Sequence, residues 1–375
     1  MADKLSKLRV GIIFGGRSGE HEVSVASARS VMDALDTAKY EIVPIGISRE
    51  GRWLAGADPR QLAAGAVDEA GQGVTAVAIT GDPTRGGLVA AGPAAAPPPT
   101  LDVVLPVLHG PYGEDGTLQG LLEMAGVPYA GCGVLGAALG MDKEKAKQVF
   151  MAEGLPVVPW LTVRRRDHER DAEAVCTTIE ARFPYPVFVK PANLGSSVGV
   201  GKAHDRAELR RALTVALEYD RKALVEPAIN ARELECGVLG NDEPLASVVG
   251  EVAPSNEFYD YRAKYVDNAS RLFIPAEIPP EQTDELRRMA VAAFRALDLS
   301  GLARVDCFLD RDSGKLYINE VNTMPGFTQI SMYPKLWEAS GIPYPQLLDR
   351  LIELALERYA DKARTRIAYA PEDDG

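Results

Sequence analysis

The chain has 375 residues, of which 46% are hydrophobic and 25% are charged, and its formal net charge is −12. This length exceeds that at which a single hydrophobic core stops growing, so we expect a soluble globular protein of two or three domains. The acidic balance argues against nucleic acid or an anionic membrane as a partner, so any bound phosphate must be held by a local basic site.

The cysteines and the apolar segments narrow the class further. Four cysteines lie far apart without a CxxC pair, which favours neither a disulfide framework nor a zinc site. The apolar run at residues 10–14 is too short for a secretory signal, and no apolar run approaches the about 18 residues of a membrane-spanning helix. We therefore expect a cytoplasmic protein with reduced thiols and no membrane contact.

Residues 1–135 are predicted to form the first domain. Residues 8–14 are typical of a buried strand, and a glycine-rich turn then leads into a helix with acidic residues in its first turn. Further strands are expected at residues 40–47 and 101–108, and strands that alternate with helices indicate a mostly parallel sheet. Residues 54–100 are rich in Ala, Gly and Pro, which predicts a low-complexity surface insertion without chemistry.

The second predicted domain, residues 136–233, contains a candidate phosphate-binding loop. A strand expected at residues 187–190 ends in Lys190, and a loop with three glycines and the serines Ser196 and Ser197 follows. Glycines allow backbone N–H groups to close on phosphate oxygens, and serines add hydroxyl donors. The loop lacks the Walker A pattern, and alone it would more often be a plain hairpin turn. The metal site expected farther along the chain favours the phosphate-binding interpretation.

Helices are also expected in this domain at residues 142–153 and 206–218, with a strand at residues 223–226. Lys143 lies at the start of the first of these helices, where the helix dipole disfavours a cation unless an anion neutralises it. We interpret Lys143 as a phosphate ligand, and a surface lysine is the alternative.

The strongest chemical signal lies in the third predicted domain, residues 234–364, before a polar tail at residues 365–375. Two strand-like segments around the turn-forming residues 310–314 predict an antiparallel hairpin. Because side chains alternate along a strand, one face should carry Arg304, Asp306, Glu320 and Asn322, with Asp306 opposite Glu320. The same alternation places Phe308, Leu316 and Ile318 on that face, which would then be partly buried.

Two facing acids repel each other unless a cation lies between them. Two carboxylates and an amide oxygen at one sheet end suit Mg²⁺, a hard ion that prefers oxygen ligands. The hairpin therefore predicts a magnesium site that binds substrate phosphates, and a pair of solvated acids is the alternative.

Two further segments of this domain suggest a ligand. Residues 258–265 hold four aromatic and two cationic side chains without helical or strand periodicity, which predicts a lid over a charged ligand. An irregular loop at the core edge is the alternative. Residues 322–331 leave the hairpin through a Pro-Gly turn that can aim backbone N–H groups at an oxyanion, unless it is a plain type II turn. Amphipathic helices are expected at residues 280–297 and 345–359.

Six of these segments occur in an order that resembles the ATP-grasp superfamily and, more closely, the D-alanine–D-alanine ligase family. The resemblance covers nearly the whole chain and lies in residues 15–24, 108–120, 141–143, 195–199, 259–265 and 319–326. It implies an α/β fold with three-domain ATP-grasp architecture and an N-terminal Rossmann-like domain. It also implies a cytoplasmic, homodimeric enzyme that joins two D-alanines for peptidoglycan synthesis, using ATP through an acyl phosphate. The implied cofactors are ATP and two Mg²⁺ ions, which Mn²⁺ could replace.

The resemblance also implies roles for individual residues. The implied metal ligands are Asp306, Glu320 and Asn322. The implied ATP-binding residues are Lys143, Lys190, Ser197 and Lys264 for the phosphates, and Glu226 and Glu233 for the adenosine. Arg304 and the Gly326 N–H would stabilise the transferring phosphate and the oxyanion. Glu20 would bind the ammonium of the first D-alanine, linked through Ser196 and Tyr265, and Ser331 the carboxylate of the second.

Two features refine this assignment. Pro227-Ala-Ile follows Glu226 where relatives often carry another polar residue, which puts side-chain contacts to adenine in doubt. The resemblance also implies a dipeptide product instead of a D-alanine–D-lactate product, because a tyrosine at the position of Tyr265 accompanies dipeptide formation in this family.

Three alternatives are weighed against this assignment. The nearest is a D-alanine–D-lactate ligase or another ATP-dependent carboxylate–amine ligase. A nicotinamide-dependent dehydrogenase is weakened because residues 11–16 do not match GxGxxG. A nucleotide-binding regulator without turnover would not need the intact metal ligands beside Arg304.

Overall fold

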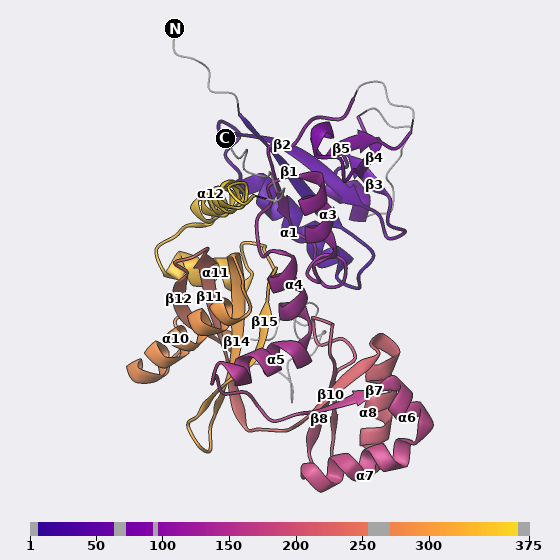
Figure 1. Cartoon of the computed structure of the whole chain (residues 1–375). Helices are drawn as coiled ribbons and strands as arrows, with labels where there is room; N and C mark the ends of the chain where they lie inside the picture. Colours follow the sequence, from indigo (N-terminus) through magenta and orange to yellow (C-terminus); the bar gives the residue numbers. More distant parts are fainter. Residues whose placement is uncertain (1–6, 64–72, 93–96, 254–270, 367–375) are drawn as a thin grey trace, which may run out of the picture.

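The computed structural model describes residues 7–63, 73–92, 97–253 and 271–366, which form three sheets with helices packed on them (Figure 1). This confirms the expected α/β fold class. The predicted lid at residues 258–265, with Lys264 and Tyr265, lies outside the described residues. No helix among the described residues combines the length and the apolar character needed to cross a membrane.

The first sheet has the strand order β5-β4-β3-β2-β1-β6. Its centre is parallel, because β1 (Leu8–Gly15) pairs with both β2 (Tyr40–Ile47) and β6 (Val103–Pro106). The last six residues of β1 are all buried, as expected for a strand covered on both faces. The helices of this part are α1 (His21–Ala34), α2 (Pro59–Ala63) and α3 (Thr117–Ala125), with the 3-10 helix η1 (Pro83–Arg85).

The segment predicted as an insertion extends the edge of this sheet. It contributes three short antiparallel strands, β3 (Trp53–Ala55), β4 (Thr75–Ile79) and β5 (Leu88–Ala90). Val77 and Leu88 belong to the same core as Val43 and Ile45 of β2. A few apolar residues among the Ala, Gly and Pro are therefore enough to anchor the segment.

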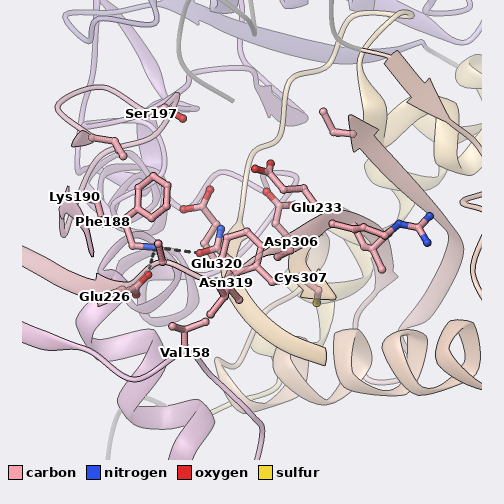
Figure 2. Close-up of a pocket in the computed structure, with 18 of the residues that line it drawn as sticks. Val158, Phe188, Lys190, Ser197, Glu226, Glu233, Asp306, Cys307, Asn319 and Glu320 are labelled. Carbon is pink, nitrogen blue, oxygen red and sulfur yellow. Dashed lines mark hydrogen bonds and ion pairs between the residues drawn. The ribbon is translucent and has the colours of Figure 1, made fainter. Parts of the chain in front are cut away.

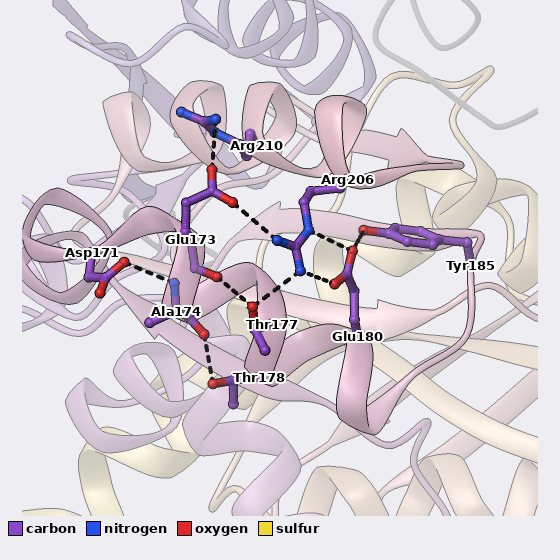
Figure 3. Close-up of polar contacts among 9 residues, drawn as sticks. All are labelled: Asp171, Glu173, Ala174, Thr177, Thr178, Glu180, Tyr185, Arg206 and Arg210. Atoms are coloured by element: carbon purple, nitrogen blue, oxygen red, sulfur yellow. Dashed lines mark hydrogen bonds and ion pairs between the residues drawn. The ribbon is translucent and has the colours of Figure 1, made fainter.

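The second sheet is antiparallel, with the order β7 (Leu161–Arg164), β10 (Lys222–Pro227), β8 (Val187–Pro191) and β9 (Gly201–Ala203). The helices α7 (Ala172–Arg182) and α8 (Arg206–Tyr219) share its hydrophobic core, and α6 (Arg165–Arg170) precedes α7. On the surface, Arg206 of α8 contacts Glu173 and Glu180 of α7 (Figure 3). Two helices, α4 (Val134–Met141) and α5 (Lys143–Ala152), connect the first sheet to the second (Figure 1).

The third sheet is also antiparallel, with the order β13 (Arg271–Phe273), β12 (Leu245–Ala253), β11 (Ala231–Gly240), β14 (Gly301–Asp310) and β15 (Leu316–Asn322). The helix α10 (Pro280–Ala296) shares a core with one face, and α11 (Met332–Ala339) packs on β11 and β12. The last helix, α12 (Tyr344–Lys362), returns to the first sheet, where Leu347 and Leu351 share a core with Val10 (Figure 1). The last helix therefore packs against the first strand of the chain.

Candidate active site

The predicted hairpin is present and has the predicted register at its functional end. Strands β14 and β15 pair antiparallel, with Asp306 opposite Glu320 and Arg304 opposite Asn322. The sequence pattern therefore located the two acids correctly. The cation expected between the two acids was Mg²⁺. In the structure, the Nε and Nη2 of Arg304 donate to the two carboxylate oxygens of Asp306, both at 2.7 Å.

The expected placement of two apolar residues on this face is wrong. Ile318 pairs with Cys307 and Leu316 with Leu309, so Asn319 is an extra residue between the two paired segments. One inserted residue reverses the alternation of a strand. Leu316 and Ile318 consequently lie in the core shared with α10, and Phe308 alone of the three lines the site.

The bulge also adds a residue to the site that was not predicted. Asn319 and Glu320 both line the same cavity, although they are neighbours in the sequence. The Asn319 Oδ1 accepts a hydrogen bond from the Lys190 Nζ at 3.1 Å (Figure 2). The hairpin is thereby tied directly to the second sheet.

A cavity of about 480 Å³ lies between the second and third sheets. Its wall combines apolar side chains, among them Val158, Phe188 and Ile229, with charged ones (Figure 2). Of the residues predicted to bind ATP or metal, the cavity is lined by Lys143, Lys190, Ser197, Glu226, Glu233, Asp306 and Glu320. A cavity with an apolar part and convergent charges is typical of a small-molecule or cofactor site.

A buried ion-pair cluster forms one side of this cavity. Glu226 is 3% exposed, and its carboxylate lies 2.7 Å from the Lys190 Nζ and 2.9 Å from the Lys147 Nζ. Burial alone would raise the pKa of Glu226, but the charges of the two lysines outweigh burial and hold that pKa below its ordinary value. Lys147 was not predicted. The only sequence feature that could have marked Lys147 as a site residue is its position one helical turn after Lys143.

Arg304 is held by a second acid that was also not predicted. Its Nε lies 2.9 Å from the Glu235 Oε2, and Glu235 faces Asp306 across the β11–β14 ladder. The Asn322 Nδ2 donates to the Asp306 Oδ2 at 2.9 Å. The guanidinium is thus fixed by two carboxylates, and Asp306 accepts from two neighbours on its own hairpin.

The acids on the hairpin fit the predicted magnesium site in their chemistry. Asp306 and Glu320 line the cavity from facing strands, whereas Asn322 is not among the lining residues and donates its Nδ2 to the Asp306 Oδ2. No cluster of three or more His, Cys, Asp or Glu suited to a metal ion occurs among the described residues, so further oxygen ligands would come from Asn322 or from the phosphates of the nucleotide. Hard oxygen ligands with space for phosphate oxygens suit Mg²⁺. The metal ligands remain a prediction.

Glu320 is also paired with Lys143. The Lys143 Nζ lies 3.1 Å from the Glu320 Oε2 and donates to the Leu194 carbonyl at 2.7 Å. Lys143 therefore links the glycine- and serine-rich loop to the hairpin. This agrees with its predicted place in the site, and its role as a phosphate ligand remains a prediction.

Glu20, at the start of α1, lies against the same loop. The Ser196 Oγ donates a hydrogen bond to the Glu20 Oε1, as the predicted link between them requires. A Cβ added at Gly195 or Gly110 would lie 3.2 or 2.6 Å from the Glu20 Oε2, so both glycines permit a close approach. Ser196 and Ser197 have positive φ angles of 52° and 57°, a conformation that non-glycine residues seldom adopt.

A second buried acid, Glu114, lies near Glu20 and joins the first sheet to the Pro-Gly turn. Its two carboxylate oxygens accept hydrogen bonds from the Gly110 N–H at 2.7 Å and the Met324 N–H at 2.9 Å. Burial, together with the charge of Glu20, raises the pKa of Glu114 to about 8. Glu114 lies within one of the segments that carry the family resemblance, residues 108–120, but no role was predicted for it.

The turn that contains Gly326 is anchored from both sides. The Ser27 Oγ on α1 accepts from the Phe327 N–H at 3.3 Å, and the Ser331 Oγ accepts from the Thr328 N–H at 3.1 Å. A Cβ at Gly326 would lie 3.2 Å from the Ser331 Oγ, which brings these two predicted residues together. Their roles as oxyanion donor and carboxylate ligand remain predictions.

The sheets and the cavity between them define a protein of the ATP-grasp class. Family models described as D-ala D-ala ligase N-terminus and D-ala D-ala ligase C-terminus match residues 9–132 and 149–353. The chain therefore belongs to the D-alanine–D-alanine ligase family. This overturns the dehydrogenase alternative.

Individual relatives agree with this assignment. A D-alanine–D-alanine ligase of Acetivibrio thermocellus is 51% identical over 370 residues, covering 96% of this chain and 98% of its own length. One from Heliobacterium modesticaldum is 52% identical over 367 residues, covering 98% of this chain and 100% of its own length.

Solved structures show the same fold. The VanG D-Ala:D-Ser ligase from Enterococcus faecalis has a TM-score of 0.83 and 38% identity, over 93% of this chain and 100% of its own. The D-alanine-D-alanine ligase from Coxiella burnetii has a TM-score of 0.81 and 37% identity, over 96% of this chain and 98% of its own.

Proposed function

We propose that this protein is an ATP-dependent ligase that joins two D-alanine molecules to D-alanyl-D-alanine, with release of ADP and phosphate, for peptidoglycan synthesis. The observation that carries the proposal is one charged cavity, lined by Asp306 and Glu320 from the hairpin and by Lys143 and Lys190 from the second sheet and α5. The relatives that are 51% and 52% identical over nearly the whole chain are named D-alanine–D-alanine ligase, which supports the proposal.

The reaction proceeds in two steps, a phosphoryl transfer and the formation of an amide bond. A carboxylate oxygen of the first D-alanine attacks the γ-phosphorus of ATP, which forms an acyl phosphate and releases ADP. The amine of the second D-alanine then attacks the acyl carbon, and the tetrahedral species expels phosphate and loses a proton. Both steps spread negative charge over phosphate and carbonyl oxygens, so the site must supply positive charge and hydrogen-bond donors.

Residues that line the cavity, together with others of the predicted site, can supply this charge. Lys143 and Lys190 bind the phosphates of ATP with Ser197 and Lys264, and Glu226 and Glu233 lie on the side of the adenosine. Arg304, oriented by Glu235 and Asp306, donates to the transferring phosphate. Mg²⁺ held by Asp306, Glu320 and Asn322, in two ions that Mn²⁺ could replace, would neutralise phosphate charge.

The amino acids bind on the side of α1 and the Pro-Gly turn. Glu20 pairs with the ammonium of the first D-alanine and is oriented by Ser196, with Tyr265 completing the link. The Gly326 N–H donates to the oxyanion, and Ser331 binds the carboxylate of the second D-alanine. We also propose a cytoplasmic homodimer as the working form.

The experiment that tests the proposal measures ADP formation with ATP, Mg²⁺ and a panel of D- and L-amino acids. D-alanine alone should support ADP release and yield the D-alanyl-D-alanine dipeptide in equal amount. Absence of ADP release with D-alanine, while another carboxylic acid supports it, would redirect the proposal to a different carboxylate–amine ligase.

The main competing function is a ligase that joins D-alanine to a different second substrate, such as D-serine or D-lactate. The likeness to a D-Ala:D-Ser ligase at 38% identity favours including D-serine beside D-lactate in competition with D-alanine. With equal concentrations of the three acceptors, we expect the D-alanyl-D-alanine dipeptide to be the main product by mass spectrometry. A dominant D-serine or D-lactate product would overturn the acceptor assignment and leave the ligase chemistry intact.

A further inference from the structure

We infer that Lys222 and Asp220, at the end of α8 and the start of β10, are positioning residues that set Lys143 and the glycine- and serine-rich loop in the active site. Neither residue lines the cavity. The inference rests on the proposed ligase function, because it concerns how two parts of that site are held.

Lys222 is buried beneath the N-terminus of α5. Its side chain is 4% exposed, and its Nζ lies 2.5 Å from the Asp142 Oδ2 and 2.9 Å from the Glu144 Oε2. These two acids flank Lys143 in the sequence. Asp142 is also the N-cap of α5, because its carboxylate accepts a hydrogen bond from the Lys145 N–H. One buried ammonium therefore fixes the residues on both sides of Lys143.

The same segment controls the backbone to which Lys143 is joined. The Lys222 carbonyl accepts from the Ala192 N–H at 3.1 Å, and the Ala192 carbonyl accepts from the Lys143 N–H at 3.0 Å. This chain of hydrogen bonds runs from β10 through the base of the loop to the first residue of α5. Lys143 then extends to Glu320 and the Leu194 carbonyl from a start that is fixed by side chain and backbone together.

Asp220 anchors the near end of the loop. Its Oδ2 accepts from both the backbone N–H and the Nδ2 of Asn193, each at 2.8 Å. Three and four residues later, Ser196 and Ser197 have left-handed backbone angles, which cost energy for residues with a Cβ and persist only where the surroundings hold them. Asp220 holds one end of this segment, and Glu20 holds Ser196.

A role in fold stability alone does not explain these charges well. A buried lysine with one buried acid, Glu144, and one partly buried acid, Asp142, carries a desolvation cost, and well-packed apolar residues often stabilise a fold as well or better. What the charged cluster adds is direction, because hydrogen bonds fix where the start of α5 lies relative to the loop. Burial would lower the pKa of Lys222, but its bonds to Asp142 and Glu144 outweigh burial and raise that pKa, so the ammonium stays charged.

The test is a double-variant cycle that combines Lys222→Met with Lys143→Met. We expect Lys222→Met to lower kcat by roughly 10- to 100-fold, because displacement of a reacting group by about 1 Å can cost about 10²-fold. If Lys222 acts through Lys143, the double variant should be no slower than Lys143→Met. Independent sites would instead show effects that multiply.

Matched variants separate position from folding. Lys222→Arg keeps the charge and should recover most of kcat, and Asp220→Asn should raise KM for ATP without altering the Lys222–Lys143 coupling. Arg206→Met on α8 removes exposed ion pairs from the same sheet unit and should leave kcat unchanged. Should Lys222→Met fail to fold, Lys222→Gln with the same Lys143 partner provides the cycle.

Two results would overturn the inference. One is wild-type kcat in a folded Lys222→Met protein, and the other is a double variant whose loss is the product of the single losses. A crystal structure of Lys222→Met gives a readout without turnover, in which Lys143 should have lost its contacts with Glu320 and the Leu194 carbonyl. If the wild type fails to form ADP with D-alanine, the proposed function fails, and that structure still tests the positioning role.

Discussion

The unit built on the second sheet carries two ion-pair clusters of similar composition in opposite surroundings. The cavity cluster joins Glu226 to Lys147 and Lys190, and its side chains are at most 10% exposed. The surface cluster joins Arg206 and Arg210 of α8 to Glu173 and Glu180 of α7 (Figure 3). There, Arg206 is 43% and Glu173 is 54% exposed.

The two clusters differ in what their charges do. Water screens the surface cluster, so each of its pairs contributes little to stability, and the apolar core that α7 and α8 share holds the two helices together. The cavity cluster has lost its water, so each charge depends on its partners. Lys190 and Glu226 line the cavity, and Lys147, which does not line it, is 1% exposed and pairs with Glu226.

Glu114 shows what happens to a buried acid that has no cation paired directly with it. Glu114 is buried like Glu226, but both of its oxygens are bound by backbone N–H groups, and the nearby charge of Glu20 repels it. Its pKa rises to about 8, whereas the pKa of Glu226 falls below its ordinary value. Burial makes the shift large, and the partner decides its direction.

The largest predicted effect comes from removing the acid at the centre of the cavity cluster. Glu226→Leu leaves Lys147 and Lys190 as like charges near each other without a carboxylate. We expect the free energy of unfolding to fall by about 3–5 kcal/mol, as for other broken buried ion pairs. Urea denaturation measures this loss. Glu226→Gln, which keeps the shape of the side chain, is the control. Wild-type stability in Glu226→Leu would contradict the argument that the buried lysines need a carboxylate partner.

The second prediction concerns Arg304, a buried cation that we propose contacts the transferring phosphate. It is held by Asp306 and Glu235, so Arg304→Ala removes a donor that is already oriented. We expect kcat to fall by about 10²–10³-fold, as for loss of one preorganised oxyanion donor, with less effect on ATP binding. Steady-state kinetics and calorimetric ATP titration separate the two. Arg304→Lys should be intermediate because it loses the planar fork, and wild-type kcat in Arg304→Ala would refute the role.

The pH dependence of stability tests the buried acid without a cation. Between about pH 4.5 and pH 8, folded Glu114 keeps its proton while the unfolded chain releases it, so the folded state binds more protons. Stability from this group therefore falls as pH rises, by about 1.4 kcal/mol per pH unit.

Thermal or urea unfolding of the wild type and Glu114→Gln across this range measures the difference. The advantage of the wild type should shrink steadily toward pH 8, because glutamine has no titrating proton. Glu22→Gln, an exposed acid on α1, should give a curve parallel to that of the wild type. Parallel curves for Glu114→Gln as well would rule out the raised pKa.

The sequence predicted those parts of the site that local patterns encode. Alternation and a turn cluster were enough to place Asp306 opposite Glu320, since register follows from the turn. The bulge at Asn319 also left a signal, because the buried residues of β15 are Leu316, Ile318 and Val321, and the last spacing is three instead of two. Read with strict alternation, that signal was missed.

The buried partners could not be found in this way. Lys147, Lys222 and Glu235 are charged residues in a helix or a strand, where a sequence pattern places such residues on the surface. Their burial depends on acids or cations that approach from other elements, as Glu226 approaches Lys147. Such contacts are long-range, and one sequence gives no spacing that marks them. The fold class needed only the order of strands and helices, which is why it was predicted more fully than the site.

The smallest predicted effect comes from the surface cluster and completes the comparison. Arg206→Met removes the ion pairs with Glu173 and Glu180, and we expect a loss of only about 0.2–1 kcal/mol in the free energy of unfolding, with kcat unchanged. The difference from the wild type should vanish near 1 M salt, where the screening length is about 3 Å. Urea denaturation at low and high salt measures it, with Arg206→Lys as a charge-retaining control. The contrary result would be a salt-insensitive loss in the free energy of unfolding as large as that of Glu226→Leu. Exposure would then not separate the two clusters. Packing of the Arg206 stem would stabilise the α7–α8 contact as strongly as burial stabilises the cavity cluster.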